Sequence, residues 1–242
     1  MPKVSIILPT YNQARYLKKA ILSVINQSFK DWELIIINDG STDNTEQVVK
    51  NFNNNRIHYI LRKRKKTKGR GEYSAINLGY SVAKGDYLTW IHSDDTWPKD
   101  SLKWRVGALA NTPYDLVHFD IQTVDAFDKK LDVVKAKNWP AKKILDYYCH
   151  EYTKNFVGIF HHTTLMIRRS AIDKIGPWDE NLPYAGDLDY MLRALLKCKI
   201  RYVPKVVYNY RVYKSGQGRY SGIKTRKIVN QILNKICKNC RD

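Results

Sequence analysis

The sequence predicts an α/β fold with a Rossmann-like, mostly parallel central sheet that helices flank on both faces. Three short runs, at residues 4–8, 34–37 and 57–61, are continuously apolar instead of alternating. Such runs are typical of strands that are buried on both faces of a parallel sheet. Apolar residues at helical spacing separate the runs, so the chain opens as strand, helix, strand, helix, strand. The 242 residues, 43% of them hydrophobic, suffice for one large domain with a sizeable core.

The elements follow one another in order along the first hundred residues. Residues 17–24, 48–52 and 73–83 carry apolar side chains three and four positions apart, which predicts a helix in each segment. Residues 87–91 are apolar, aromatic or β-branched and predict a fourth buried strand. That strand ends abruptly in polar residues, at the start of the sequence's most distinctive stretch.

The second half continues the α/β pattern less regularly. Strands are predicted at residues 114–120 and 163–167, closing strands lie within 202–210, and a helix with one buried face covers 188–195. Residues 121–155 have the weakest pattern, with only one short helix expected there. We therefore expect the central sheet to be completed by this half, with a poorly defined segment inserted into it.

Polar residues follow the first, second and fourth predicted strands. They are Thr10, Tyr11 and Asn12 after the first strand, Asp39 after the second, and His92, Ser93, Asp94 and Asp95 after the fourth. Parallel strands end at the same edge of a sheet, and ligands of open α/β sheets bind beside that edge. We therefore expect one shared site, where a nucleotide could stack on Tyr11 and hydrogen-bond its base to Asp39.

The adjacent carboxylates of Asp94 and Asp95 are the main chemical signal of this edge. They would repel each other at the mouth of a buried strand unless a cation or a proton neutralised them. Carboxylate oxygens are the ligands that Mg²⁺ or Mn²⁺ prefers, and phosphates of a ligand would complete the shell. Because no glycine-rich phosphate-binding loop occurs in the sequence, such phosphates would need a cation. The alternative is a surface turn in which an aspartate caps the next helix.

Charge and cysteine content narrow the classes of partner. The chain has 42 lysines and arginines against 23 aspartates and glutamates, a net charge of +19, which indicates an acidic partner. Seven cationic residues lie within residues 62–70, and we interpret most of them as part of a solvated loop. Contact of one or two of them with a phosphate or an acidic lipid stays open. Four scattered cysteines, and the lack of a signal peptide or membrane-spanning stretch, favour a reducing cytoplasm. The pair Cys237 and Cys240 is a weak metal or redox signal.

Four stretches together resemble the family 2 glycosyltransferases, which have the GT-A fold. They are VSIILPTYN, IIINDGSTDNT, GEYSAINLGYSVAKGDYLTWIHSDD and RRSAIDKIGPWDENLPYAGDLDYMLRAL, in that family's order and spacing. The resemblance implies an inverting transfer of a sugar from a nucleotide-diphosphate donor, with a UDP-sugar expected. A hydroxyl of a glycan or lipid-linked acceptor would receive the sugar in polysaccharide or glycoconjugate synthesis, and Mn²⁺ or Mg²⁺ would assist.

The resemblance also implies roles for individual residues. Those that would bind the nucleotide are Pro9, Thr10, Tyr11, Asn12, Asp39, Ser74, Asn77 and Ser93. The metal would be held by Asp94 and His92, and Asp187 would be the catalytic base. Contacts with the diphosphate or the acceptor are expected from Asp95, Asp189, Arg211 and Lys214.

Three positions depart from that family's pattern. His92 stands where many relatives have Asp or Asn, and it would either ligate the metal as neutral imidazole or hydrogen-bond the ribose. Gly186 stands where many relatives have a Glu before the base. Tyr213 replaces a frequent His near the diphosphate, so that Arg211 or Lys214 would supply the positive charge.

Structural explanations compete for two of these groups. Asp187 and Asp189 lie in the first turn of a predicted helix, where the helix dipole favours negative charge. His161 and His162 resemble a metal pair, but neighbouring side chains in a strand point to opposite faces. We therefore interpret the two histidines as structural or acceptor-lining residues.

We expect a GT-A domain over residues 1–220, in which 1–98 bind the nucleotide sugar and 99–220 the acceptor. Residues 221–242 predict a basic amphipathic helix with one apolar stripe. This helix would rest on an anionic membrane surface, which implies a cytoplasmic protein peripheral on the inner face of the membrane. Alternatively, it would pack on the core or on a second subunit in a homodimer.

Three other functions stay open. A nucleotidyltransferase of the same fold lacks support, because no glycine-rich loop with a lysine opens the chain. A nucleic-acid-binding protein would explain the charge, but no motif that reads RNA or DNA accompanies it, so we expect no nucleic acid partner. A degenerate transferase that binds the donor without turnover is suggested by His92 and Gly186.

Overall fold

The computed structural model describes residues 1–63, 71–150, 160–213 and 223–238. Four parallel strands form the first half of its central sheet. Their order is β3 (Ile57–Leu61), β2 (Trp32–Asn38), β1 (Val4–Thr10) and β4 (Tyr87–Trp90). All residues of β1, β2 and β4 are buried, as continuous apolar runs predict for strands covered on both faces. The predicted α/β fold with its mostly parallel sheet is therefore confirmed.

The second half of the sheet is mixed. β7 (Met166–Arg168) runs antiparallel to β4 and to β5 (Leu116–Val124), which also pairs with β6 (Lys130–Val134) in a hairpin. The remaining strand, β8 (Ile200–Arg211), runs parallel beside β5. β8 is one long strand where two were expected, since shifts of its register against β5 take up the irregularity around Pro204. The expected strand at 163–167 starts late, because residues 162–164 form a 3₁₀ turn.

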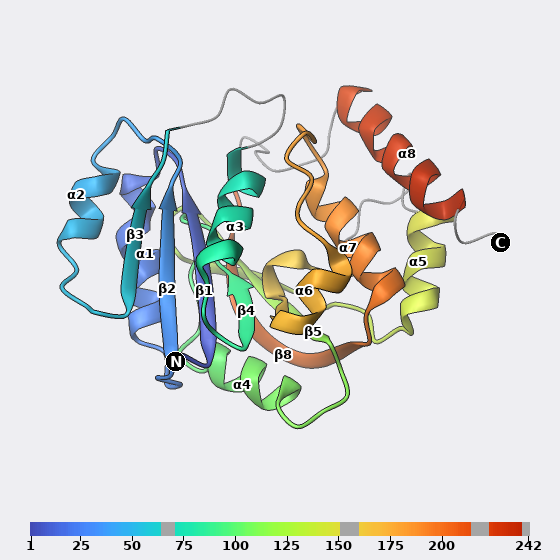
Figure 1. Ribbon diagram of the computed structural model, residues 1–242, viewed down its shortest axis with the longest axis horizontal. Helices are drawn as coiled ribbons and strands as arrows, with labels where there is room; N and C mark the ends of the chain where they lie inside the picture. The colour runs from blue at the N-terminus through green and yellow to red at the C-terminus, as the bar shows by residue number, and fades with distance from the viewer. Residues whose placement is uncertain (64–70, 151–159, 214–222, 239–242) are drawn as a thin grey trace.

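Helices cover both faces of this sheet (Figure 1). One face packs against α1 (Ala14–Ile25), α2 (Thr45–Lys50) and α4 (Ser101–Leu109). The other face packs against α3 (Gly71–Val82), α5 (Ala141–His150), α6 (Arg169–Ile175) and α7 (Gly186–Lys197). Alternate residues of β1 serve the two layers: Ile6 and Leu8 join the first core cluster, and Ile7 joins the second. Residues 121–155, which had the weakest sequence pattern, contain two regular elements, β6 and α5.

The C-terminal helix α8 (Ile223–Lys238) packs on the domain itself. It contacts α5 and α7, and lies beside α5 in Figure 1. Its apolar stripe is buried in the same core cluster as those helices, through Val229, Ile232, Leu233 and Ile236. The structure therefore matches the core-packing alternative, and this stripe is not left over for a membrane. Among the described helices, none is both long and apolar enough to cross a bilayer.

A disulfide joins Cys149 of α5 to Cys237 of α8, and it corrects the expectation that the cysteines are thiols. The two residues are 88 positions apart in sequence, so spacing alone gave no sign of the pairing. Cys198 is a free thiol. The suggested pair of Cys237 with Cys240 fails for Cys237, which is already bonded, while Cys240 lies outside the described residues.

Reduction of this disulfide is expected to lower the thermal midpoint of unfolding. A cross-link over a loop of this length restricts the unfolded chain, and typical disulfides contribute about 2–4 kcal/mol. Thermal melts followed by circular dichroism, with and without a reductant, measure the effect. Cys237→Ser should melt at the lower midpoint and ignore the reductant, whereas Cys198→Ala should respond as the parent chain does. Equal midpoints for the oxidised and reduced chain would contradict a stabilising role.

Candidate active site

The predicted polar residues do share one edge of the sheet. Thr10, the last residue of β1, lies beside Asn38, the last of β2, and the amide of Asp39 donates a hydrogen bond of 2.9 Å to the Thr10 carbonyl. The amide of Ile91 likewise donates to Ile7, which fixes the end of β4 against β1. Pro9 and Thr10 are buried inside this edge. The loops after β1, β2 and β4 therefore start side by side.

The loop after β1 is tied to the loop after β2 by Asn12. Its backbone has a φ of 52°, a left-handed conformation that asparagine tolerates better than most residues. Its amide donates to the Ser41 hydroxyl, and its side-chain oxygen accepts from the Thr42 amide at 2.8 Å. Tyr11 is 42% exposed at the rim. Asn12 therefore ties the two loops together, and Tyr11 lies partly exposed beside them.

Arg62 places a guanidinium against Asp39 at the end of β2. Its Nη2 lies 2.5 Å from Oδ1 of Asp39 and donates to the Gly71 carbonyl and the Ser74 hydroxyl. The side chain of Arg62 is only 11% exposed, so the expectation of a solvated loop is wrong for this residue. The signal for its role was its position directly after β3, where its amide continues the ladder to Asn38. Residues 64–70 lie outside the described part of the chain.

The side chain of Asn77 is hydrogen-bonded to other residues of the protein. Its side-chain nitrogen donates to the Trp178 carbonyl and to a carboxylate oxygen of Glu180, and its oxygen accepts from the Trp178 amide. These bonds join α3 to the loop that leads to α7. Asn77 therefore has a structural role, and the expected nucleotide contact would have to form in addition to these hydrogen bonds.

His92, Asp94 and Asp95 converge directly after β4. One possible ligand atom from each lies within 4.8 Å of the others. Nε2 of His92 is 2.9 Å from Oε1 of Glu72, and Nδ1 is 3.6 Å from Oδ2 of Asp95. Burial lowers the pKa of His92, but Glu72 and Asp95 raise it more, so that the pKa lies well above its usual value. Glu72 was missed because it comes from the start of α3, twenty residues earlier in the sequence.

The two aspartates of this cluster differ in their surroundings. Asp95 is 2% exposed and accepts hydrogen bonds from the Tyr208 hydroxyl and the Arg211 amide, at 2.9 and 2.7 Å. Burial raises the pKa of Asp95. Asp94 is less buried, and its carboxylate accepts from the Tyr213 hydroxyl at 2.9 Å. Ser93, between them and His92, is buried. Carboxylate oxygens at this spacing fit a divalent cation, with Asp94 as the more accessible ligand.

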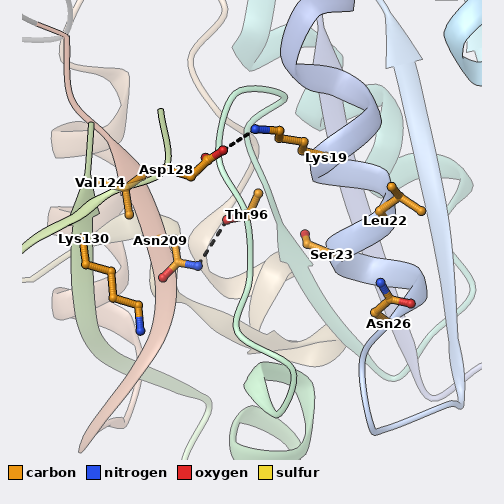
Figure 2. Close-up of a pocket in the computed structure, with 9 residues that line it drawn as sticks. All are labelled: Lys19, Leu22, Ser23, Asn26, Thr96, Val124, Asp128, Lys130 and Asn209. Atoms are coloured by element: carbon orange, nitrogen blue, oxygen red, sulfur yellow. Dashed lines mark hydrogen bonds and ion pairs between the residues drawn. The ribbon is translucent and has the colours of Figure 1, made fainter. Parts of the chain in front are cut away.

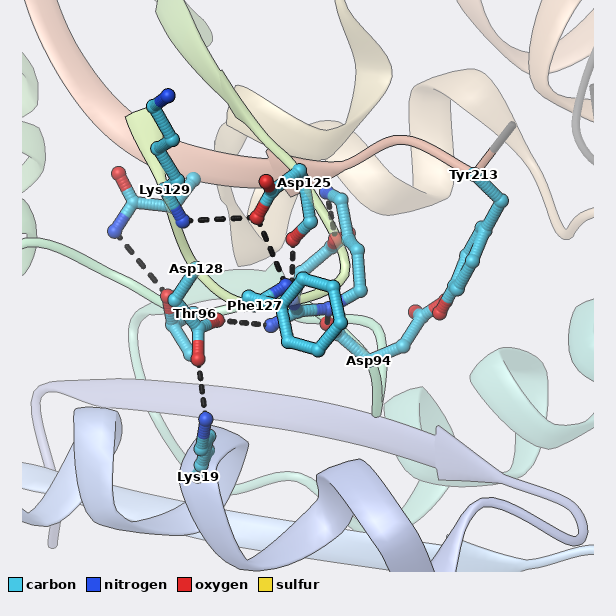
Figure 3. A network of polar contacts seen from close by, with 11 residues as sticks. Lys19, Asp94, Thr96, Asp125, Phe127, Asp128, Lys129 and Tyr213 are labelled. Carbon is cyan, nitrogen blue, oxygen red and sulfur yellow. Dashed lines mark hydrogen bonds and ion pairs between the residues drawn. The ribbon is translucent and has the colours of Figure 1, made fainter. Parts of the chain in front are cut away.

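The side chain of Arg211 contacts the loop that follows β4 and the turn between β5 and β6. Its Nε donates to the Asp94 carbonyl, its Nη1 donates to the Asp125 carbonyl, and its Nη2 pairs with Asp128. Figure 3 shows Asp128 also reached by Lys19 from α1. The guanidinium therefore makes three contacts with protein oxygens, and the expected diphosphate contact stays a prediction. Lys214, the alternative cation, lies outside the described residues.

A cavity of about 330 Å³ lies behind this network, between α1 and β8 (Figure 2). The residues that line it are Lys19, Leu22, Ser23, Asn26, Thr96, Val124, Asp128, Lys130 and Asn209. None of the predicted site residues is among them. Its lining also lacks any cluster of metal-ligating side chains, so the chemistry belongs to the sheet edge and not to this cavity.

Asp187 lies in the first turn of α7, and Gly186 before it is forced by packing. The Gly186 amide donates to the Tyr73 hydroxyl at 3.0 Å, and a Cβ at this position would lie 2.5 Å from the Tyr73 ring. Tyr73 therefore excludes the larger residue that many relatives have here. Asp189, in the same first turn, accepts two hydrogen bonds from Arg193 at 2.7 and 2.9 Å. Asp189 is thus committed to its own helix.

His162 lies between Asp187 and the cluster of His92, Asp94 and Asp95. Its Nδ1 is 3.5 Å from Oδ2 of Asp187, and its ring centroid is 5.7 Å from that of His92. The sequence placed the two histidines just before a strand and applied strand geometry to them, but residues 162–164 form a 3₁₀ turn, and His162 faces the site. His161 is partly buried, and desolvation lowers its pKa to about 4, so it stays neutral. The sequence offered no signal that would have separated the two.

The sequence match agrees with this geometry. Residues 5–176 match the family model described as Glycosyl transferase family 2. This range includes Asp39 and the cluster of His92, Asp94 and Asp95. This chain belongs to glycosyltransferase family 2. The resemblance seen in the four motifs is therefore confirmed.

Relatives of this glycosyltransferase are similar over most of its length. An uncharacterized glycosyltransferase of Rickettsia typhi is 30% identical over 214 residues, which cover 88% of this chain and 64% of that protein. The chondroitin synthase of Pasteurella multocida is 30% identical over 243 residues, covering 97% of this chain and 24% of that protein. The chain therefore spans less than two thirds of the length of these two relatives.

Solved structures of glycosyltransferases share the fold. Residues 1–349 of S. aureus TarS in complex with UDP-GlcNAc superpose with a TM-score of 0.72 at 20% identity, over 96% of this chain and 65% of that one. A mannosyltransferase from Pyrobaculum calidifontis, in complex with GDP-Man and Mn²⁺, gives a TM-score of 0.66 at 19% identity, over 100% of this chain and 65% of that one. At these identities the likeness shows the GT-A fold alone.

Proposed function

We propose that this glycosyltransferase moves a hexosyl or N-acetylhexosaminyl group from a UDP-sugar to a hydroxyl of a glycan or lipid-linked acceptor, with inversion at the anomeric carbon. The observation that carries the proposal is the placement of three groups around one sheet edge. The Asp39–Arg62 pair and the cluster at residues 92–95 lie at this edge, and His162 contacts both His92 of that cluster and Asp187, which supports one shared site for a base, a diphosphate and a sugar. The proposed setting is the synthesis of a polysaccharide or glycoconjugate.

The reaction assigns one chemical task to Asp187. The acceptor oxygen forms a bond to the anomeric carbon while the bond from that carbon to the diphosphate oxygen breaks and the nucleotide diphosphate leaves with the electron pair. Asp187 takes the proton of the acceptor hydroxyl as this bond forms, and general-base help of this kind contributes about 10²–10⁴-fold to a rate. Its place on the first turn of a helix keeps the carboxylate fixed relative to the sheet edge.

Donor binding falls to the other residues of the edge. Asp39, held by Arg62, would accept from the base, and Tyr11 would stack on it. Asp94, with Asp95 and His92 behind it, would hold Mn²⁺ or Mg²⁺, which when bound stabilises negative charge on the leaving diphosphate. The choice of a UDP-sugar is supported by the TarS complex with UDP-GlcNAc, and the choice of Mn²⁺ by the mannosyltransferase complex.

Calorimetric titration with UDP, GDP and dTDP, each with and without Mn²⁺, tests the donor site. We expect micromolar binding of UDP that needs the metal, followed by turnover when UDP-sugars and candidate acceptors are added. Preference for GDP or dTDP would refute the assigned donor class. Binding of RNA or DNA with a steep salt dependence, and of no nucleotide, would replace the proposal with the nucleic-acid-binding alternative.

Gly71→Ala is expected to weaken nucleotide binding. A Cβ at this position would lie 1.9 Å from Oδ2 of Asp39, so Asp39 would have to leave its place. Loss of a hydrogen bond to a charged group costs about 1.5–3 kcal/mol, or roughly a 10–100-fold rise in the Kd for UDP. Gly107→Ala in α4 is the matched control, because nothing lies within 4 Å of its added methyl group. Equal UDP affinity of the two variants would contradict a role of Asp39 in nucleotide binding.

A further inference from the structure

We propose that His162 is a positioning residue for Asp187, and this inference rests on the proposed function. Nδ1 of His162 lies 3.5 Å from Oδ2 of Asp187. In a free enzyme such contacts are often long, and they shorten when the substrate completes the site. His162 then directs Oδ2 of Asp187 and so orients the carboxylate for the acceptor hydroxyl.

The imidazole of His162 is held by a set of aromatic rings. It stacks on Trp90 with 6.2 Å between ring centroids and 20° between ring planes. Trp178 meets it edge-on at 6.3 Å, and His92 lies on another side at 5.7 Å. Trp90 and Trp178 are themselves buried and in contact with each other. These contacts restrict the rotation of His162, so its Nδ1 is held towards α7.

The backbone that carries His162 is fixed by a buried cation. Arg105 of α4 is 0% exposed, and its Nη1 donates to the carbonyls of Thr164 and Leu165 at 2.8 and 3.0 Å. Burial lowers the pKa of Arg105 to about 9. The described residues give this guanidinium no carboxylate partner, so its donors are satisfied by the carbonyls that follow His162 and by two hydroxyls. A buried cation used in this way indicates that the position of this turn matters.

The contact with His162 is one that helps to set the direction of the Asp187 carboxylate. The side chain of Asp187 is 17% exposed, and its helix neighbour Asp189 already binds Arg193. A reacting group that is misplaced by about 1 Å can lose about 10²-fold in rate. His162 therefore acts on catalysis through Asp187, and the metal cluster on the other side of the ring shares the same fixed turn.

The test compares His162→Leu with His162→Asn. Asn keeps an N–H donor near the position of Nδ1, whereas Leu fills the space without one. We expect His162→Leu to lower kcat by about 10–10²-fold with the KM for the UDP-sugar and the Mn²⁺-dependent affinity for UDP unchanged. His162→Asn should recover most of kcat. His58→Asn is the matched control, since His58 also faces a carboxylate, Glu33 at 3.4 Å, but from the opposite end of the sheet.

Three outcomes would overturn the inference. They are an unchanged kcat in His162→Leu, an equally low kcat in both His162 variants, and a loss of UDP affinity in place of a loss of kcat. The double variant Asp187→Asn with His162→Leu should be no slower than Asp187→Asn alone, and further slowing would also count against it. If Asp187→Asn itself keeps the full rate, the proposed base is wrong, and that result is distinct from a failure of His162 alone.

Discussion

Asp187→Asn is expected to abolish sugar transfer while UDP binding survives. An amide cannot take the proton of the acceptor hydroxyl, and removal of general-base help lowers kcat by about 10²–10⁴-fold. The shape of the first turn of α7 should persist, because Asn and Asp are nearly isosteric and the turn is fixed by the bond from Gly186 to Tyr73. Steady-state rates with a UDP-sugar, alongside calorimetric titration with UDP and Mn²⁺, measure the two effects separately.

Asp189→Asn provides the matched control for this prediction. It removes a carboxylate from the same helical turn, but one that binds Arg193 and not the site. We expect a lower thermal midpoint with the rate largely kept, the reverse of the pattern for Asp187→Asn. A full transfer rate in Asp187→Asn, or the larger rate loss in Asp189→Asn, would show that the base has been assigned to the wrong residue.

Asp94→Ala is expected to remove the metal dependence of donor binding. Asp94 is the more accessible carboxylate of the β4 cluster, and without it one hard ligand of the cation is lost. Titration with UDP should then give the same weak affinity with and without Mn²⁺. Asp95→Ala differs, because it leaves the Tyr208 hydroxyl and the Arg211 amide without their acceptor, at a cost of about 1–3 kcal/mol in folding stability.

Tyr213→Phe is expected to weaken Mn²⁺ binding less than Asp94→Ala does. It removes only the hydroxyl that donates to Asp94, and loss of such a supporting hydrogen bond typically weakens metal affinity by about 10–100-fold. The expected order of Mn²⁺ affinity is the parent chain, then Tyr213→Phe, then Asp94→Ala. A variant at residue 94 that still binds UDP in a Mn²⁺-dependent manner would place the metal elsewhere.

The sequence predicted the sheet edge well because local patterns encode it. Continuous apolar runs identified β1, β2 and β4, and the polar residues after each run had to meet once the strands were parallel. The contacts of Arg62 and Arg211 could not be predicted, because their partners are set by packing. Arg62 turns inward to an aspartate 23 residues away in sequence, and Arg211 serves carbonyls more than 80 residues away.

His162 and Glu72 illustrate a second limit. Strand periodicity treats neighbouring residues as pointing to opposite faces, but a 3₁₀ turn breaks that rule at residues 162–164. Glu72 looked like an ordinary acid of a helix start, and only the approach of α3 to β4 brings it within 2.9 Å of His92. Both residues owe their place to contacts between distant elements, which a single sequence does not report.

The bond between Cys149 and Cys237 closes residues 149–237 into a covalent ring. Strands β7 and β8 and helix α7, with Asp187 at its start, all lie between these two cysteines. A protease that cuts one peptide bond anywhere in that ring would leave a protein that still migrates as one molecule until a reductant separates the pieces. The turn that carries Asp187 would then stay attached to strands β1 to β4 after a single cut.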